Sequence, residues 1–170
     1  SLVFQEVFLF NDTILENIKM GKPDATEDEV KSAAAAARCD EFINQLPDGY
    51  NTVIGEKGAK LSGGEKQRIS IARAILKDAP IIILDEATAF VDPENENIIQ
   101  EAINHLTRGK TVLVIAHRLS TITHVDQTIV IEKGKIAEQG THEALIKKEG
   151  LYKRMWTAHN TALGWGIRRA

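Results

Sequence analysis

The sequence predicts an α/β fold built on a largely parallel sheet, with an almost purely helical part before it. Two runs of apolar residues, 81–84 and 111–116, have the length and β-branched composition of strands. Continuous apolar runs are typical of strands that are buried on both faces, as they are in parallel sheets. A helical pattern lies between the two runs, and the order strand, helix, strand is that of an α/β protein.

The clearest helix signal covers residues 62–77. Ser62 is a good N-cap, and Glu65 three residues later completes a reciprocal capping box. Apolar residues then recur at helical spacing, and Pro80 follows the end of the pattern, as is common after a helix. A capped helix is therefore expected directly before the first strand.

A second helix is expected between the two strands. Asp92 is a good N-cap, Pro93 suits the first helical position, and Glu94 places a negative charge in the first turn. An apolar stripe at helical spacing then extends from Ile98 to Leu106. This helix would connect the two predicted strands.

Weaker patterns complete the chain. Helices are expected at 11–20, 26–39, 40–46 and 141–150, a loop at 52–60 and a hairpin over 129–137. We interpret the chain as the start of an α/β core, a helical subdomain, the rest of the core with its C-terminal helices, and a tail, at 1–9, 10–77, 78–156 and 157–170. The last residues, 164–170, show no periodicity, and we expect them to be mobile.

The composition is that of an ordinary globular protein and excludes several classes. Its 170 residues are 43% apolar, which is enough for one hydrophobic core. A net charge of −3 argues against a general nucleic-acid binder. Cys39 is the only cysteine, so an intrachain disulfide and a cysteine-based metal cluster are excluded, and we expect it to be a small packed residue. No apolar run reaches the ~18 residues that a membrane span needs, and no signal peptide is visible.

Two acidic residues, Asp85 and Glu86, directly follow the first predicted strand. In open α/β sheets, ligands bind beyond the carboxyl ends of the strands. Acidic side chains beside a buried strand are costly unless a cation or a substrate proton uses them. One carboxylate at this position can hold magnesium beside a nucleotide, and a second can polarise an attacking water. A plain strand followed by an acidic loop is the alternative.

Two glycines stand at the start of the predicted helix 62–77, in the string Leu61-Ser62-Gly63-Gly64-Glu65. Glycines leave the first backbone N–H groups accessible, and the helix dipole favours an anion at this end. The hydroxyl of the serine adds a further polar group. An ordinary capped helix with a flexible turn would show a similar pattern, so this string alone leaves both interpretations open.

The longer string Leu-Ser-Gly-Gly-Glu-Lys-Gln-Arg, residues 61–68, resembles the signature motif of the ATP-binding domains of ABC transporters. The resemblance extends to about Trp156, with further motifs in the order that the family has. Residues 81–86 resemble Walker B followed by the catalytic glutamate. Other positions resemble the Q-loop glutamine (Gln5), the exporter X-loop (52–58), the D-loop (89–92) and the switch histidine (His117).

The resemblance implies a partial P-loop NTPase fold, with a RecA-like parallel-sheet core and an inserted α-helical subdomain. It implies ATP and Mg²⁺ as cofactors. Two residues are expected to be catalytic: Glu86, which would activate water, and His117, which would contact the γ-phosphate. The expected metal residues are Gln5 and Asp85. The nucleotide-binding set implied by the motifs is Gln5, Leu61, Ser62, Gly63, Gly64, Glu65, Asp85 and Asp92.

The partners and the location are also implied by the resemblance. The family forms head-to-tail dimers in which the signature motif of one domain covers the ATP of the other. A transmembrane domain and a second ATP-binding domain are therefore the expected partners, at the cytoplasmic face of the cell membrane, with no nucleic acid. Hydrolysis of ATP would drive transport across that membrane, and the segments 8–14 and 52–58 resemble those of exporters.

One family motif is absent from the sequence. No string of the form G-x-x-x-x-G-K-[ST], the Walker A loop, occurs, and neither does the aromatic A-loop. Because both precede the Q-loop in the family and the chain begins without methionine, we interpret it as cut inside the fold. We therefore expect this chain alone to bind and hydrolyse no useful ATP, and to expose apolar surface where strands are missing.

Three alternatives remain at this point. A soluble ABC ATPase of DNA repair or translation shares the signature and Walker B motifs, and an importer ATPase does as well. The exporter-like segments at 8–14 and 52–58 disfavour both. A domain that only binds its partner without hydrolysis is disfavoured because Glu86 and His117 are both present.

Overall fold

The computed structural model describes residues 1–4, 6–85, 93–116 and 119–165. The chain divides into two compact units, residues 1–115 and 116–170. The first unit contains both the helical part and the parallel sheet, and the second contains a hairpin and the C-terminal helices. Each unit is described by itself.

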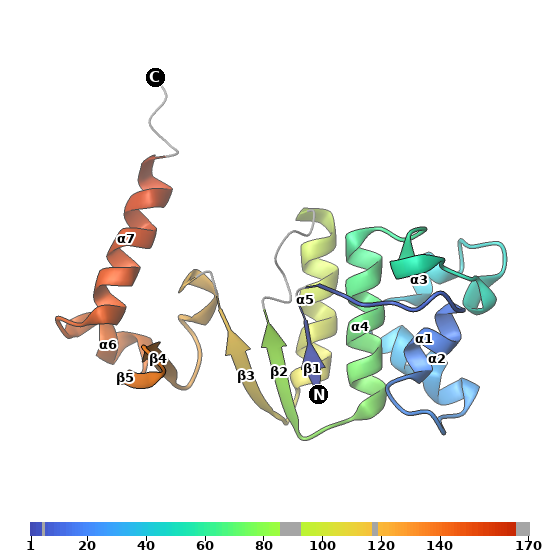
Figure 1. The fold of residues 1–170 in the computed structure, drawn as a ribbon, viewed down its shortest axis with the longest axis horizontal. Helices are drawn as coiled ribbons and strands as arrows, with labels where there is room; N and C mark the ends of the chain where they lie inside the picture. Colours follow the sequence, from blue (N-terminus) through green and yellow to red (C-terminus); the bar gives the residue numbers. More distant parts are fainter. Residues whose placement is uncertain (5, 86–92, 117–118, 166–170) are drawn as a thin grey trace. The chain divides into compact units, whose positions relative to one another are not determined.

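The sheet of the first unit is parallel, as predicted. Its strands are β1 (Leu2–Val3), β2 (Ile81–Asp85) and β3 (Thr111–Ile115), in the order β1-β2-β3 (Figure 1). In the register, Leu2 pairs with Ile83 and Asp85 with Ile115. Helix α5 (Pro93–Thr107) connects β2 to β3. The predicted strand–helix–strand order is therefore confirmed.

The burial of the sheet corrects one expectation. Ile82 and Leu84 of β2 belong to the same buried core as Ile103 of α5, so one face of the sheet is covered by helices. On the other face Ile81 is 55% exposed, and Leu113 of β3 is 51% exposed. The apolar runs were predicted to be buried on both faces, but the structure covers one face of β2 and leaves both faces of β3 exposed. The second face is an exposed apolar surface, as expected for a sheet that lacks part of its packing.

The helical part contains four α-helices and two 3₁₀ turns. They are α1 (Ile14–Lys19), α2 (Glu27–Ala36), α3 (Asp40–Ile43), η1 (Gly49–Asn51), η2 (Glu56–Gly58) and α4 (Gly63–Lys77). Their starts follow local capping signals: the side chains of Thr13, Thr26 and Ser62 cap α1, α2 and α4. Helix α1 begins three residues later than predicted because Thr13 takes the capping position. Helix α2 ends before Cys39 because Arg38 has the left-handed φ of 57°.

Cys39 lies in the turn between α2 and α3 and is fully buried. Its packed environment confirms the expectation of a small core residue. Burial raises the pKa of its thiol to about 12, although the charge of nearby Arg68 acts in the opposite direction.

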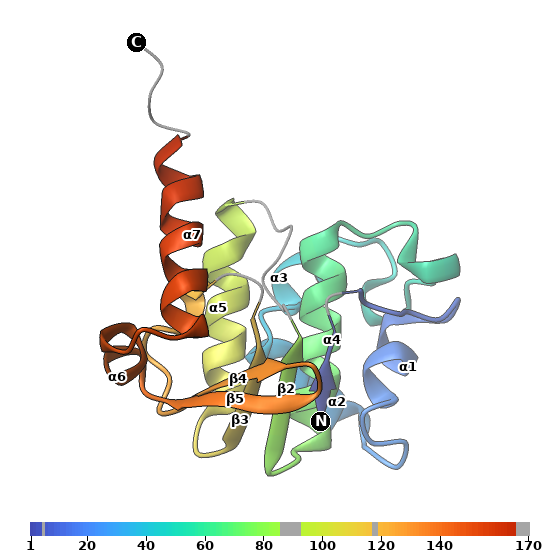
Figure 2. The ribbon, with the colours of Figure 1, turned by 60° about the vertical axis from the view of Figure 1, so that its left-hand side comes forward.

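The second unit is a β-hairpin followed by two α-helices. Strands β4 (Thr128–Glu132) and β5 (Lys135–Gly140) are antiparallel, and η3 (Leu119–Ile122) precedes them. The predicted turn at Lys133 and Gly134 is present, and both residues have positive φ. Helix α6 (His142–Lys147) is capped by Thr141, as predicted. Figure 2 shows β4 and β5 side by side.

Helix α7 (Leu151–Trp165) extends beyond residue 156, where the sequence suggested that a tail begins. Its first turn packs inward: Tyr152 is 1% exposed, and its hydroxyl lies 2.7 Å from Nδ1 of His142. Its later residues show no clear apolar stripe, so the sequence pattern did not predict them. None of the helices in the described ranges is long and apolar enough to cross a bilayer.

Candidate functional site

The start of α4 holds the most specific of the predicted functional residues. Ser62 has an extended backbone, and its hydroxyl accepts a hydrogen bond from the N–H of Glu65. The carboxylate of Glu65 accepts in return from the N–H of Ser62, at 2.7 Å. This is the predicted capping box, which fixes the chain direction at the helix start. Leu61, directly before the cap, is buried and anchors this end.

The two glycines at this helix end differ in their surroundings. Gly64 is buried, whereas Gly63 is exposed. A Cβ added at Gly63 would meet nothing within 4 Å, so the packing of this chain does not require a glycine there. Open space at the positive end of a 15-residue helix is the geometry that an anionic group from outside can use.

Asp85 lies at the same end of the first unit. It is the last residue of β2 and is half-buried beside the end of β3. Helix α4 ends at Lys77, and after three intervening residues β2 begins and runs in the opposite direction (Figure 1). The N-terminus of α4 and the carboxyl end of β2 therefore face the same way, and ligands bind beyond the carboxyl ends of the strands in open α/β sheets.

Other predicted residues lie outside the described ranges. Gln5, Glu86, Asp92 and His117 are among them, so their roles stay predictions. Within the residues that the structure does describe, no cluster of three or more acidic, histidine or cysteine side chains is arranged to hold a metal ion. Asp85 by itself offers carboxylate oxygens, the donor type that Mg²⁺ prefers.

Helix α4 also contacts the segment at the end of β1, which sequence reasoning missed. The side-chain amide of buried Gln67 donates to the carbonyl of Phe4 at 3.4 Å, one residue before Gln5. Arg68 is buried too, with its guanidinium carbon 5.1 Å from the ring centre of Phe42. Both residues are polar and belong to the string 61–68, so the sequence carried no signal that they would be buried.

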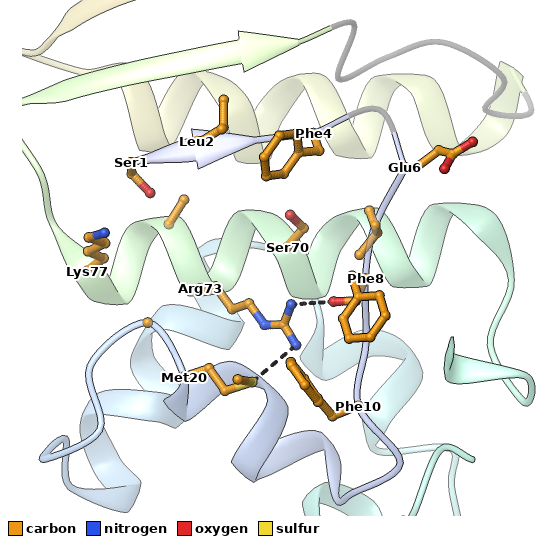
Figure 3. A pocket seen from close by; sticks show the side chains of 13 residues that line it. Ser1, Leu2, Phe4, Glu6, Phe8, Phe10, Met20, Ser70, Arg73 and Lys77 are labelled. Atoms are coloured by element: carbon orange, nitrogen blue, oxygen red, sulfur yellow. Dashed lines mark hydrogen bonds between the residues drawn. The ribbon is translucent and has the colours of Figure 1, made fainter. Parts of the chain in front are cut away.

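A groove of about 290 Å³ lies between the segment after β1 and helix α4 (Figure 3). Its walls include the exposed aromatic side chains of Phe4, Phe8 and Phe10, with Met20 from the end of α1. The rings of Phe8 and Phe10 meet edge to face, with centres 4.8 Å apart. Arg73 and Lys77 of α4 line the other side. An exposed aromatic groove of this kind is typical of a protein–protein contact.

A family model described as "ABC transporter" matches residues 1–89, just over half of the chain. The match contains the signature helix and β2 with Asp85, the two elements that the fold brings to one end of the first unit. The chain belongs to the ABC transporter family.

Individual relatives agree with this assignment. The chain is 55% identical over 159 residues to the Bacillus subtilis (strain 168) protein named "Putative multidrug export ATP-binding/permease protein YgaD". It is 54% identical to a similarly named protein of Staphylococcus aureus (strain NCTC 8325). Each alignment covers 94% of this chain but only 27–28% of the relative, so the chain spans just over a quarter of their length.

A solved structure gives the same result for the fold. The chain is similar to a bacterial Atm1-family ABC exporter solved with ATP bound, with a TM-score of 0.83 and 46% sequence identity. The similarity covers 93% of this chain and 28% of that protein. The α/β fold with a parallel sheet is therefore that of an exporter's nucleotide-binding domain, a P-loop NTPase fold.

Proposed function

We propose that this chain forms the greater part of an ATP-binding domain of an ABC exporter, which couples ATP hydrolysis to transport across a membrane. The observation that carries the proposal is the start of α4: a capped, glycine-led helix end that is exposed and faces the same way as Asp85. The printed names of the relatives, which combine export, ATP binding and a permease, favour the exporter over a soluble ATPase or an importer.

The proposed site residues form two groups: those that would contact a partner's nucleotide and those that would act on this chain's own nucleotide. The exposed N–H groups at Gly63 and the hydroxyl of Ser62 would contact a phosphate presented by a second copy or a partner ATP-binding domain. Asp85, with Gln5, would hold Mg²⁺ on this chain's own nucleotide; that ion supplies neutralisation of phosphate charge. Glu86 would orient and deprotonate water, and His117 would stabilise the developing charge on the phosphate.

The location and the membrane partner are part of the same proposal. In the relatives, ATP-binding and permease functions share one name, and this chain matches about a quarter of their length. The groove lined by the exposed rings of Phe4, Phe8 and Phe10 and by the charged side chains of α4 combines apolar and polar surface, so it suits a cytoplasmic segment of the membrane-spanning part. The domain would then lie at the cytoplasmic face of the cell membrane.

The decisive experiment is Glu86→Gln in the full-length transporter. The amide keeps the size of the carboxylate but cannot take a proton from water, so hydrolysis should fall by about 10²–10³-fold while ATP binding is kept. Hydrolysis is followed by phosphate release and binding by calorimetry. Near-normal turnover of the variant would refute the assignment.

The isolated 170-residue chain gives a second test. Because the printed sequence holds no Walker A loop, it lacks the nest of N–H groups and the lysine that bind the β- and γ-phosphates. Calorimetry should therefore find no ATP binding at roughly millimolar affinity or tighter. Clear binding in that range would show that the described residues bind nucleotide without that loop.

A further inference from the structure

The side chain of Arg73, in the third turn of α4, is bound to the opposite wall of the groove. Its Nη1 donates to the carbonyl of Phe8 at 2.6 Å (Figure 3). Its Nη2 donates to Oδ1 of Asn17 at 2.7 Å. Its Nε donates to the backbone carbonyl of Asn17, and Sδ of Met20 lies 3.8 Å from Nη2. All four partners are neutral. One guanidinium therefore holds the aromatic segment and α1 against the signature helix at once.

Asn17 links Arg73 to the backbone of the aromatic segment by hydrogen bonds. It is fully buried, its Oδ1 accepts from the N–H of Phe10 at 2.9 Å, and its Nδ2 donates to the carbonyls of Phe10 and Thr13 at 3.0 and 2.9 Å. The same Oδ1 also accepts from Arg73. Because a buried amide whose bonds are broken costs free energy, the turn from Phe10 to Thr13 keeps its shape while Asn17 stays in place.

A backbone contact strengthens the junction. A Cβ at Gly21, just after α1, would lie 2.3 Å from the carbonyl oxygen of Arg73 and 3.1 Å from its carbonyl carbon. The end of α1 therefore touches the main chain of α4 at the same residue whose side chain makes the hydrogen bonds. Such a contact is possible only without a side chain at position 21.

From this geometry we infer that Arg73 is a positioning residue, which transmits movement of the aromatic groove wall to the signature end of α4. The inference rests on the proposed function, since it assumes that a membrane-spanning partner occupies the groove. Arg73 and Ser62 belong to one uninterrupted helix, about 16 Å apart along its axis. A displacement of Phe8 and Phe10 by a partner is passed through the guanidinium to α4, and a rigid helix carries it to its N-terminus.

The variant Arg73→Lys tests this role, and Arg108→Lys is its matched control. Lysine keeps the positive charge but loses the planar fork that bonds to three oxygens at once. Arg108 is exposed, directly after α5, so the control makes the same chemical change away from the groove. Both variants are made in the full-length transporter, together with Gly21→Ala, which separates α1 from α4 without altering any side-chain donor.

The first measurement is hydrogen exchange followed by mass spectrometry. In Arg73→Lys, peptides spanning residues 6–13 should exchange at least about tenfold faster, while peptides from the interior of α4 keep the wild-type rate, because only the hydrogen bonds from the guanidinium are lost. Gly21→Ala should show the same selective effect. Equal acceleration of both regions would mean that Arg73 only contributes to global stability, and that result would overturn the inference.

The second measurement is the ratio of ATP hydrolysis with transported substrate to hydrolysis without it, in reconstituted membranes. Arg73→Lys should lower this ratio at least about fivefold, and Arg108→Lys should leave it unchanged. An unchanged ratio in Arg73→Lys, with the 6–13 segment loosened, would overturn the transmission role. Absence of substrate-stimulated hydrolysis in the wild-type transporter would instead refute the proposed function, and the transmission role with it. The exchange data would still show whether Arg73 holds the segment 6–13 against α4.

Discussion

Helices α4 and α7 are both 15 residues long, and each has a glycine at or directly before its first residue. Their N-termini differ in whether a carboxylate of the chain accepts from the first N–H groups of the helix. At α7, the carboxylate of Glu138 on β5 accepts from the N–H groups of Leu151 and Tyr152 at 2.8 and 2.9 Å. At α4, the carboxylate of Glu65 turns back to the N–H of Ser62, and Gly63 at the helix start is exposed.

The two glycines show why the difference matters. A Cβ at Gly150 would lie 1.8 Å from Oε1 of Glu138, so this glycine makes room for the chain's own anion. A Cβ at Gly63 would meet nothing within 4 Å, so the room there is left free within this chain. The same helix dipole is used for internal stability in one unit and remains available to an external anion in the other.

The largest expected effect, on ATP hydrolysis, comes from placing a negative charge at the exposed N-terminus of α4. In Gly63→Asp, a carboxylate at the start of α4 would occupy the position of an incoming phosphate and repel it. We expect ATP hydrolysis by the full-length transporter to fall by about 10²–10³-fold, while the thermal stability stays the same or rises slightly because an acid in the first turn suits the dipole.

Gly63→Ala is the matched control, since it adds bulk without charge and should lose far less activity. Hydrolysis is measured by phosphate release, and stability by thermal unfolding. If the aspartate variant hydrolysed ATP as fast as the alanine variant, the open end of α4 would not be an anion site.

The converse change removes the carboxylate that accepts from the N-terminal N–H groups of α7. In Glu138→Ala, the N–H groups of Leu151 and Tyr152 lose their acceptor, so their hydrogen exchange should accelerate by about tenfold, with α4 unaffected. Because the vacated end would then resemble that of α4, added phosphate should restore part of the protection. The control is Glu143→Gln on α6, where no change is expected; equal exchange in Glu138→Ala and wild type would contradict the comparison.

A smaller effect is expected from the cap of α4. Ser62→Ala removes the hydroxyl that accepts from the N–H of Glu65, which should cost about 1 kcal/mol of unfolding free energy. Urea unfolding of the full-length protein's ATP-binding domain measures it. Ser62→Thr, which keeps the hydroxyl, should recover most of the loss, and an alanine variant as stable as wild type would show that the capping box does not stabilise this end.

The smallest effect is one of pH. Hydrogen bonds from the N–H groups of Tyr152 and Leu151, with the charges of Arg154 and Lys148, hold the pKa of Glu138 below its usual range. A lowered pKa stabilises the folded state above the ordinary glutamate pKa of about 4.3 and loses that stabilisation as pH falls through the lower value. Exchange protection at the start of α7 should therefore be constant from pH 7 to about 5 and decline below about 4. A decline already at pH 6 would point to another group.

The comparison also separates what the sequence predicts from what it does not. The cap at Ser62 depends on a residue three positions later, and it was predicted and is present; Thr26 caps α2 by the same short-range pattern. Glu138 caps α7 from 13 residues away, and Arg73 binds Asn17 across 56 positions, so no local pattern could indicate either. For the same reason the strands were located and some exposed apolar surface was expected, but which strand faces are exposed was not predicted, since burial depends on which elements pack there.

The candidate site divides in the same way. The string 61–68 and the strand ending at Asp85 each have a strong sequence signal. That they lie at one end of the fold was not predicted, because it depends on the reversal of the chain between Lys77 and Ile81. The contact of Gln67 with Phe4 and the aromatic groove have no comparable signal, because they arise from the path of the chain after β1.

The burial of Cys39 has a practical consequence for all of these experiments. With its thiol pKa at about 12 and no exposed surface, almost none of it is the reactive thiolate at neutral pH. It is also the single cysteine of this chain. Within these 170 residues, spin or fluorescent labels can therefore be attached at newly introduced cysteines, such as at Phe10 or Ser62, without first replacing Cys39.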